Sequence, residues 1–330
     1  MNDLLHRIDS FVQLGMHLKG FGQDETSAQC MQQAIVENRW FSAEDILLAI
    51  DAIRSELLER KKIEDWLKPY STAITRCQPQ RIAIIMAGNI PLVGFFDLMC
   101  ALICGHSVAI KPSSKDRALM EYVCRTLNDI DPQINIAQYD PEADYDKIIA
   151  TGGDSAARHF SQCYATTPSL IRGSRHSAAL LDGNESKAEL EGLYHDIFSY
   201  SGMGCRNISL LLLPEGYTPP IVVPKMNEMF HGNYLHHRAM LTMQGVTFND
   251  HGGALTVEQD SFSDALSIIN IMRYRTIEQA EEWLKTHDEQ LQCVVSHCSL
   301  HPRCVAFGRA QYPALTDYAD GIDVIKFLTA

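Results

Sequence analysis

Cys205 is the residue whose type and neighbours most directly indicate a reactive side chain. It follows Gly202-Met203-Gly204, and glycines let the backbone approach a bound substrate closely. A cysteine thiolate is a strong nucleophile and a tolerable leaving group, so it can accept an acyl group and release it again. The alternative is a buried structural cysteine, which is the expected role of most of the other nine cysteines. The neighbouring Arg206 could add positive potential, or its side chain could point away.

Three polar turns come directly after apolar runs that are typical of buried strands. These turns are Gly88-Asn89, Lys111-Pro112-Ser113-Ser114-Lys115 and Thr151-Gly152-Gly153. Ligands of open parallel sheets bind at the carboxyl ends of the strands, so we expect the three turns along one edge of a sheet. Each turn also has an ordinary interpretation, in which Asn89 is a turn or cap residue and Lys111 a solvated strand end.

Histidines and further cysteines raise the question of a metal site. The segment from Cys293 to Cys304 holds five possible ligands in twelve residues. Its spacing lacks the paired Cys-Xaa-Xaa-Cys knuckles of zinc sites, so the sequence predicts no metal. His231, His236 and His237 are expected on a helix surface, although either of the last two could donate a proton during catalysis.

The elements that must position these residues alternate between helices and strands. Residues 1 to about 70 predict helices, because apolar residues recur at helical spacing over 4–18 and 42–67. Strands are then expected at 81–87, 107–111, 134–137, 147–151, 178–181, 209–213, 266–272 and 293–296, with helices at 91–104, 116–127, from 154, at 185–200 and at 276–287. This alternation predicts βαβ units, parallel sheets and an open α/β fold.

Composition narrows the class of protein. The chain of 330 residues is long enough for two domains, and its net charge of −13 argues against binding to nucleic acid or to an anionic membrane. The longest apolar run, 90–104, contains Asp97 and is too short to span a bilayer. Ten cysteines without a secretion signal predict reduced thiols in a cytoplasmic protein.

Taken in order, the strand-end motifs resemble those of a known family. The segment MAGNIPLVGFFDLMCALICGHSVAIKPSS resembles aldehyde dehydrogenases, in which an Asn-Xaa-Pro turn opens a helix and the next strand ends in Lys-Pro-Ser. ATGGDSAAR and SGMGCRNISLLLLPEGY stand where that superfamily has its Thr-Gly-Ser turn and its Gly-Gln-Xaa-Cys motif. Among the branches, the chain is most similar to acyl-CoA reductases related to the fatty-acid reductase of bacterial luminescence, and its ending GRAQYPALTDYADGIDVIKFL supports that branch.

The resemblance implies an aldehyde dehydrogenase-like fold of two open parallel-sheet α/β domains. Residues 1–175 would form a helical segment plus the dinucleotide-binding domain, 176–305 the domain of the catalytic cysteine, and 306–330 a segment that packs back on the body. Cys205 would be the nucleophile, and the side-chain amide of Asn89 would form the oxyanion hole with the backbone N–H of Cys205.

The resemblance also implies a nicotinamide cofactor. Lys111, with Ser113 beside it, would hold the adenosine ribose, and Thr151-Gly152-Gly153 would support the dinucleotide, although Ala157 replaces the usual later glycine. Relatives that prefer NAD place a glutamate where this chain has Ser114, which Lys115 follows. A hydroxyl beside a cation suits a 2′-phosphate, so NADPH is expected rather than NADH.

One departure from the family favours reduction of the acyl group over its hydrolysis. Hydrolytic aldehyde dehydrogenases carry a water-activating glutamate in the segment that is LIRGSRHSA here, where Ile171 and Arg172 stand. Without that base, the thioacyl group should accept hydride or exchange with a thiol, which predicts reduction of an acyl thioester to an aldehyde. Arg172, Arg175 and His176 could contact phosphates of the acyl carrier or lie in a solvated loop.

Several alternatives stay open. The acyl donor could be acyl-CoA, an acyl phosphate or an acyl-carrier-protein thioester, or the chain could be a redox-inactive acyl-binding subunit. Partners could be a second copy of the chain or an acyl-transfer protein. Glu258 is a candidate for the glutamate that fixes the nicotinamide ribose, but its surroundings do not match the family motif.

Overall fold

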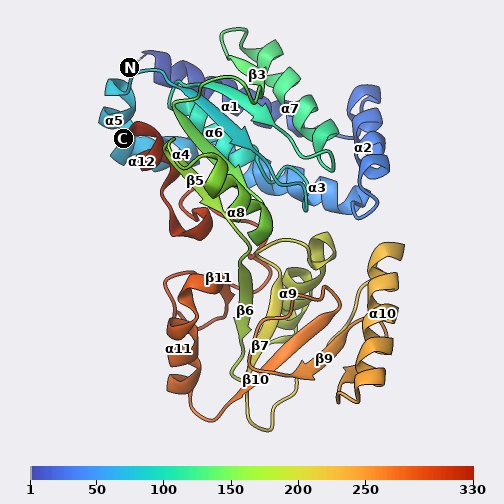
Figure 1. Ribbon diagram of the computed structural model, residues 1–330. Coiled ribbons are helices and arrows are strands. Elements are labelled where there is room, and N and C mark those ends of the chain that lie inside the picture. Colours follow the sequence, from blue (N-terminus) through green and yellow to red (C-terminus); the bar gives the residue numbers. More distant parts are fainter. Residues whose placement is uncertain (1) are drawn as a thin grey trace. The chain divides into compact units, whose positions relative to one another are not determined.

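The computed structural model describes residues 2–330, which form two compact units (Figure 1). The first unit runs up to Ser174 and includes Ala314–Ala330, and the second unit comprises Arg175–Pro313. The sequence placed a boundary at 175 and treated 306–330 as one segment. In the structure, 306–313 belong to the second unit and 314–330 to the first.

The first unit is a parallel sheet with most of the molecule's helices. Its helices are α1 (Asn2–Leu18), α2 (Glu25–Glu37), α3 (Ala43–Ala52), α4 (Arg60–Leu67), α5 (Ser71–Arg76), α6 (Phe95–Ile103), α7 (Arg117–Ile130), α8 (Asp154–Cys163) and α12 (Val324–Thr329). Its strands are β1 (Arg81–Ile85), β2 (Ser107–Lys111), β3 (Ile136–Gln138), β4 (Lys147–Thr151) and β5 (Ser169–Arg172). The strand order is β3-β2-β1-β4-β5, and all neighbours are parallel.

Alternate residues of β1 face opposite sides of this sheet. Ile82 and Ile84 belong to a large core that α1, α6 and α7 share, whereas Ala83 and Ile85 pack with Phe160 of α8. Right-handed crossovers explain the arrangement, because the chain moves one way from β1 to β3 and the other way from β4 to β5. The sheet is therefore covered on both faces, as its nearly continuous apolar strands require.

The end of the chain completes the first unit. Val324, Ile325 and Leu328 of α12 are fully buried and join the core that contains α6. The ammonium group of Lys147 donates hydrogen bonds of 2.8, 3.1 and 2.9 Å to the carbonyls of Phe327, Leu328 and Ala330. A cation at these carbonyls satisfies acceptors that the end of a helix leaves without intrahelical partners.

The second unit contains a larger mixed sheet. Its strands are β6 (His176–Leu180), β7 (Ile208–Pro214), β8 (Asn249–Asp250), β9 (Leu255–Glu258), β10 (Ile268–Tyr274), β11 (Leu291–Val295) and β12 (Cys304–Val305), and its helices are α9 (Lys187–Phe198), α10 (Glu228–Gln244) and α11 (Ile277–Thr286). The order is β12-β11-β6-β7-β10-β9-β8, with only β8 antiparallel to its neighbour among the described strands.

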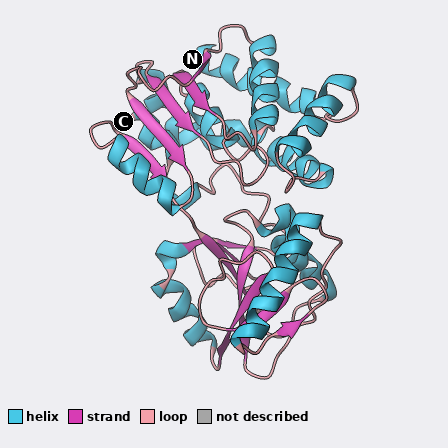
Figure 2. Cartoon of the chain, turned by 45° about the vertical axis from the view of Figure 1, so that its right-hand side comes forward, coloured by secondary structure: helices cyan, strands magenta, loops and turns pink. Residues whose placement is uncertain are grey.

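Helices cover both faces of the second sheet. Leu210 and Leu212 of β7 pack with Ala280 and Leu284 of α11, while α9 connects β6 to β7. Figure 2 shows helices on both sides of the strands of this unit. The crossover from β6 to β7 runs opposite to that from β10 to β11, so right-handed connections place α9 and α11 on opposite faces. The predicted open α/β fold with parallel sheets is confirmed.

Some predicted elements differ from those observed. The helix expected from residue 91 begins at Phe95, because residues 89–94 form a turn in which Leu92 has φ of 57°. Strand β5 was not predicted, and of helix α10 only the stretch with His231, His236 and His237 was expected to be helical. Within residues 2–330, no helix is both long and apolar enough to cross a bilayer.

Candidate active site

Cys205 lies on an exposed turn that leads into β7. The chain leaves α9 through Tyr200, Ser201 and Gly202, whose φ angles are 54°, 54° and 73°. Three consecutive residues in the left-handed region are costly for side chains other than glycine, so the surrounding structure must hold them in place. The side chains of Tyr200 and Ser201 are buried, which supplies part of that support.

Asn207 and Ser177 fix the backbone of this turn. The side-chain oxygen of Asn207 accepts the N–H of Gly204 at 2.8 Å, and its NH₂ group donates to the carbonyls of Asp196, Ile197 and Ser199 at 3.1, 3.2 and 2.8 Å. The hydroxyl of Ser177, at the start of β6, donates to the carbonyl of Cys205 at 2.9 Å. Both side chains are buried. The exposed thiol therefore stands on a rigid backbone.

The segment 306–313 is bound to the same region. The guanidinium of Arg206 donates to the carbonyl of Ala310. The buried carboxylate of Asp196 accepts the N–H groups of Gly308 and Ala310 at 2.7 and 3.0 Å. The side chain of Arg206 is thus directed to this segment, which decides between the two orientations considered from the sequence.

Burial separates Cys205 from most of the other cysteines. All ten are thiols rather than disulfides, and Cys205 and Cys163 are the exposed ones. Burial raises the pKa of Cys104 and of Cys124 to about 12 and that of Cys100 well above its usual value. These buried thiols stay protonated at neutral pH and are poor nucleophiles.

Asn89 follows β1 in the first unit, whereas Cys205 belongs to the second. The turn before Asn89 is tight, because a Cβ on Gly88 would lie 2.5 Å from the Cβ of Ser113. The turn after it is held by the buried Asp116, whose carboxylate accepts the N–H of Leu92 at 2.8 Å. Asn89 itself is half-buried, on a loop whose two ends are fixed.

The residues predicted to bind the cofactor lie at the carboxyl ends of the strands of the first sheet. The strand order reverses direction between β1 and β4, and ligands of open α/β sheets bind at such a switch point. Lys111 ends β2, and its ammonium lies 5.7 Å from the ring centre of Tyr139. The hydroxyl of Ser113 accepts the N–H of Lys115 at 3.3 Å. Ser114 and Lys115 are exposed beside it.

A pocket of about 660 Å³ lies next to Lys111, between β3 and α7. Arg117, Arg125 and the acidic Glu121 line it together with Tyr139. Arg117 also pairs with Glu37 at 2.7 Å. A pocket with an aromatic wall and several cations suits a phosphate-bearing nucleoside.

Thr151-Gly152-Gly153 leads from β4 into α8. Gly153 is the N-cap of α8, and within the described residues no side chain caps that helix end. A Cβ on Gly152 would lie 2.8 Å from that of Ala156, so a larger residue would disturb the turn. The first N–H groups of a helix are a common binding site for phosphate, and this turn fits that role.

Arg172 does not have either of the roles expected for it. It is buried at the end of β5, and its guanidinium lies 2.7 Å from the carboxylate of Asp97, with each side chain only 6% exposed. The expectations of a phosphate contact or a solvated loop are therefore wrong for this residue. Arg175 donates to the carbonyl of Glu289, and His176 stacks on Phe262 with ring centres 4.9 Å apart.

Glu258 and the three histidines considered from the sequence all lie in the second unit. Glu258 ends β9 and pairs with Arg273 at 2.9 Å. Because β9, β10 and β7 are parallel, Glu258 lies at the carboxyl ends of these strands, whereas the Cys205 turn lies at their amino ends. Glu258 therefore does not serve the Cys205 site. His231 and His236 are exposed on α10, while His237 is half-buried with Nδ1 2.9 Å from the carbonyl of Asn233.

Comparison with solved structures shows the fold. The chain is similar to aldehyde dehydrogenase 21 from Physcomitrella patens (11% identity, TM-score 0.64, 99% of this chain and 84% of that one). It is also similar to an oxidoreductase from Marinobacter aquaeolei (11% identity, TM-score 0.66, 95% and 79%) and to an aldehyde dehydrogenase from Bacillus cereus solved with NAD⁺ (14% identity, TM-score 0.58, 88% and 71%). The predicted aldehyde dehydrogenase-like fold is confirmed.

Sequence comparison gives the family. Two curated relatives are the long-chain acyl-protein thioester reductase 2 of Photobacterium leiognathi and the long-chain acyl-protein thioester reductase of Photorhabdus laumondii subsp. laumondii. Each is 24% identical over 174 residues, which make up 47% of this chain but only 36% of the relative. The acyl-CoA reductase (LuxC) family matches residues 20–219, which include both Asn89 and Cys205. The chain therefore belongs to the acyl-CoA reductase (LuxC) family of acyl reductases.

Proposed function

We propose that this protein reduces an acyl thioester to an aldehyde through a thioacyl-enzyme on Cys205, with hydride from NADPH. The observation that carries the proposal is the presentation of Cys205. Its thiol is exposed on a turn that Asn207 and Ser177 fix, while Cys100, Cys104 and Cys124 are buried. A rigid, accessible nucleophile is what repeated acylation requires.

The chain's own residues account for the acyl transfer. The thiolate of Cys205 attacks the carbonyl carbon of the thioester, and the carbonyl oxygen becomes an oxyanion. We assign its stabilisation to the side-chain amide of Asn89 and the backbone N–H of Cys205, where one such donor is typically worth about 3 kcal/mol. The carbon–sulfur bond to the carrier then breaks, and the carrier thiolate leaves and takes up a proton.

The acyl group is then bound to the sulfur of Cys205 as a thioester. A nicotinamide cofactor, when bound, supplies the hydride that adds to the acyl carbon. The same two donors would hold the alkoxide that forms, and its collapse breaks the bond to sulfur, releases the aldehyde and restores the thiolate of Cys205. The segment in which hydrolytic relatives carry the glutamate has Ile171 and Arg172 in β5, which supports reduction over hydrolysis because neither residue is a base that activates water.

The residues at the carboxyl edge of the first sheet fit this cofactor. Lys111 would bind the adenosine ribose, and Thr151-Gly152-Gly153 with the N-terminus of α8 would support the phosphates. The exposed Ser114 and Lys115 support NADPH over NADH, because a hydroxyl beside a cation attracts a 2′-phosphate.

The acyl donor is proposed to be either acyl-CoA or an acyl group on a protein. The family description names acyl-CoA, while the two curated relatives are named for acyl-protein thioesters. The ten thiols, one of them a proposed nucleophile, support action in a reducing compartment such as the cytoplasm.

The test is NADPH consumption measured side by side with a long-chain acyl-CoA and a long-chain acyl-protein thioester. We expect consumption that depends on one of these donors, and Cys205→Ala should abolish it. Cys163→Ser, which removes the other exposed thiol, should keep it. Turnover at the wild-type rate in Cys205→Ala contradicts the mechanism, and the absence of any NADPH or NADH binding by folded protein favours an acyl-binding subunit instead.

A further inference from the structure

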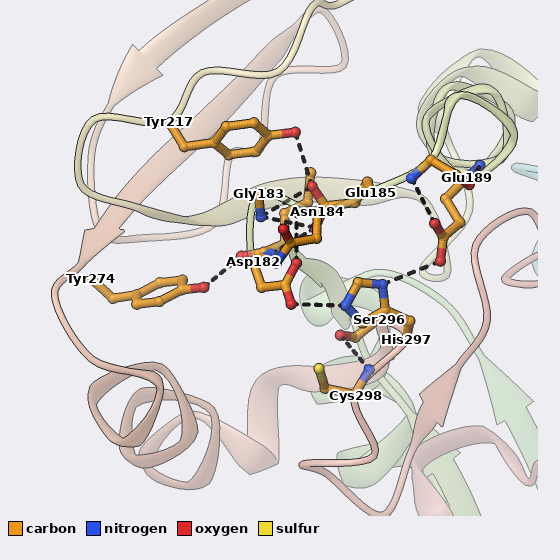
Figure 3. Close-up of polar contacts among 12 residues, drawn as sticks. Asp182, Gly183, Asn184, Glu185, Glu189, Tyr217, Tyr274, Ser296, His297 and Cys298 are labelled. Carbon is orange, nitrogen blue, oxygen red and sulfur yellow. Dashed lines mark hydrogen bonds and ion pairs between the residues drawn. The ribbon is translucent and has the colours of Figure 1, made fainter.

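Three potential metal ligands from distant parts of the sequence meet at one edge of the second unit (Figure 3). Asp182 lies just after β6, and His297 and Cys298 lie just after β11. Strands β6 and β11 are adjacent and parallel, so the loops at their carboxyl ends are brought together. The single ligand atoms that these residues offer all lie within 4.8 Å of one another.

The distances between the ligand atoms suit a small metal ion with tetrahedral coordination. A carboxylate oxygen of Asp182 lies 3.1 Å from Nε2 of His297. Two metal bonds of about 2.0–2.1 Å at a tetrahedral angle would place these atoms about 3.3 Å apart. The sulfur of Cys298, which lies within 4.8 Å of the other ligand atoms, needs to approach by no more than about 1.2 Å, since zinc–sulfur bonds of about 2.3 Å give a sulfur–nitrogen separation near 3.6 Å.

A second carboxylate orients the imidazole. Nδ1 of His297 lies 3.2 Å from Glu189, on the side of the ring away from Asp182 (Figure 3). The other oxygen of Glu189 accepts the N–H of Ser186 at 2.8 Å in the capping box of α9, so this carboxylate is held in place. Metal-binding histidines usually donate their second N–H to such a carboxylate, which fixes the tautomer and leaves Nε2 to face the ion.

The neighbouring polar groups hold the other ligands rather than compete with them. The second oxygen of Asp182 accepts the N–H of Asn184 at 2.9 Å, and the N–H of Cys298 donates to the hydroxyl of Ser296 at 3.1 Å. Glu185 is engaged with the N–H of Asp182 at 2.6 Å and with the hydroxyl of Tyr217 at 2.9 Å. The ligand set is therefore one carboxylate, one imidazole and one thiolate.

We propose that Asp182, His297 and Cys298 bind one zinc ion, with Glu189 as the positioning residue for His297. A mixed oxygen, nitrogen and sulfur set suits zinc, whereas magnesium and calcium take oxygen ligands. Three protein ligands leave a fourth position for water. The sequence alone predicted no metal, because His297 and Cys298 are contiguous and their partner is 115 positions away.

This site is separate from the proposed acyl site. Cys205 precedes β7, whereas Asp182 follows β6, and the two strands are parallel neighbours. The cluster therefore lies at the carboxyl ends of the strands, and the Cys205 turn lies at the amino ends of the same sheet. The zinc ion would join the loop after β6 to the loop after β11, so it stabilises the second unit without touching the acyl group.

Titration of chelator-treated, full-length protein with Zn²⁺ and with Co²⁺ tests the proposal. We expect one ion per chain, a rise in melting temperature with Zn²⁺, and a thiolate-to-cobalt charge-transfer band in the near ultraviolet. Cys298→Ser should remove the band, and Asp182→Asn and His297→Asn should weaken binding at least about tenfold. Glu189→Gln should weaken it by about 10- to 100-fold, as loss of a second carboxylate typically does. Binding should weaken as pH falls, since protons compete for the ligands.

Two other thiols provide the controls. Cys163→Ser removes an exposed thiol whose sulfur lies 3.4 Å from Nε2 of His159 on α8, and Cys205→Ser removes the proposed nucleophile. Both variants should bind one ion as the wild type does. A cobalt band that survives Cys298→Ser, a band lost in either control, or no stoichiometric binding by the wild type overturns the proposal. A folded Asp182→Asn variant decides the matter if Cys298→Ser does not fold.

Discussion

At the scale of single residues, Asn207 fixes the backbone of the Cys205 turn through its side chain, and local conformational preferences alone would not stabilise that turn. Its buried amide uses both of its groups, accepting one N–H and donating to three carbonyls of the chain around it. The left-handed run at Tyr200, Ser201 and Gly202 depends on such support, since its conformation is unfavourable for the two residues with side chains.

Asn207→Ala should therefore lower the free energy of unfolding by about 2 kcal/mol or more, because the partners of a buried amide are left unsatisfied. Denaturant unfolding measures this change. Asn135→Ala, at an exposed loop position before β3, is the matched control and should change stability by no more than about 0.5 kcal/mol. Equal stability of the two variants would show that Asn207 does not hold the turn.

Ser114 is the residue whose substitution should change cofactor choice. Ser114→Glu places a carboxylate at an exposed position three residues after Lys111, where it should repel a 2′-phosphate and bind a ribose hydroxyl. The ratio of kcat/KM for NADPH to that for NADH should fall by at least about tenfold, or ~1.4 kcal/mol. An unchanged ratio would remove Ser114 from the cofactor site.

At the scale of elements, a buried ion pair joins α6 to β5. Asp97 and Arg172 lie 2.7 Å apart, and one carboxylate oxygen and two guanidinium nitrogens of the pair have no hydrogen-bond partner among the described residues. Removing one partner of such a pair leaves a buried charge alone, which typically costs about 3–5 kcal/mol.

Arg172→Met should show that loss in denaturant unfolding, and the double variant Asp97→Leu/Arg172→Met should regain much of it. Recovery is expected because no charge is then left in the core. If the double variant is as unstable as the sum of the two single variants, the pair is not energetically coupled.

The N-terminus of α7 holds the Asn89 loop through Asp116. Burial raises the pKa of this carboxyl well above its usual 3.8, while the N–H of Leu92 lowers it and Glu37 raises it. The folded chain therefore binds the Asp116 proton more tightly than the unfolded chain does. The stability that this proton contributes is fully present below the unfolded pKa and is lost as pH rises through the folded one.

Asp116→Asn cannot titrate, so the wild type should lose stability relative to this variant as pH rises above about 4. Denaturant unfolding of both proteins over a pH series gives the difference directly. Parallel stability curves for the two proteins would contradict the raised pKa.

Sequence reasoning found the elements with continuous apolar patterns and missed those without them. β1, β2, β4 and β7 were predicted because both faces of a parallel strand are buried. β5 was missed because it is four residues long and its two apolar residues lie between Ser169 and the buried Arg172, so no continuous apolar run marks it. α10 buries Phe230 and Tyr234 but exposes Leu235, Met240 and Met243, so it has no clean apolar stripe, and only its histidines indicated a helix there.

The residues of the proposed acyl, cofactor and zinc sites also fall into two groups, those that a local sequence motif indicates and those that it does not. Cys205, Asn89 and Lys111 stand in local motifs next to strand ends, which a sequence displays. Ser177 and Asp182 gain their roles only through strand order, which brings β6 between β7 and β11. No local pattern records those neighbours.

At the scale of the whole molecule, each unit has a core of its own, and the last residues belong to the first unit. Ile325 and Leu328 are fully buried against α6, and Lys147 binds three carbonyls at the end of α12. The C-terminal helix is therefore an integral part of the unit that carries Asn89 and Lys111.

Leu328→Ala should lower the free energy of unfolding by about 2–5 kcal/mol, as expected for a fully buried leucine. Lys326→Ala, two positions away with a side chain 76% exposed, should have almost no effect. Thermal unfolding of both variants makes the comparison, and a Leu328→Ala protein as stable as Lys326→Ala would exclude α12 from the core.

The most direct test of the central claim is mass spectrometry of the protein after incubation with a long-chain acyl thioester in the absence of cofactor. We expect one acyl group on the peptide that contains Cys205, and its loss as aldehyde when NADPH is added. An unmodified Cys205, or an acyl group on Cys163 that NADPH does not remove, would contradict the account.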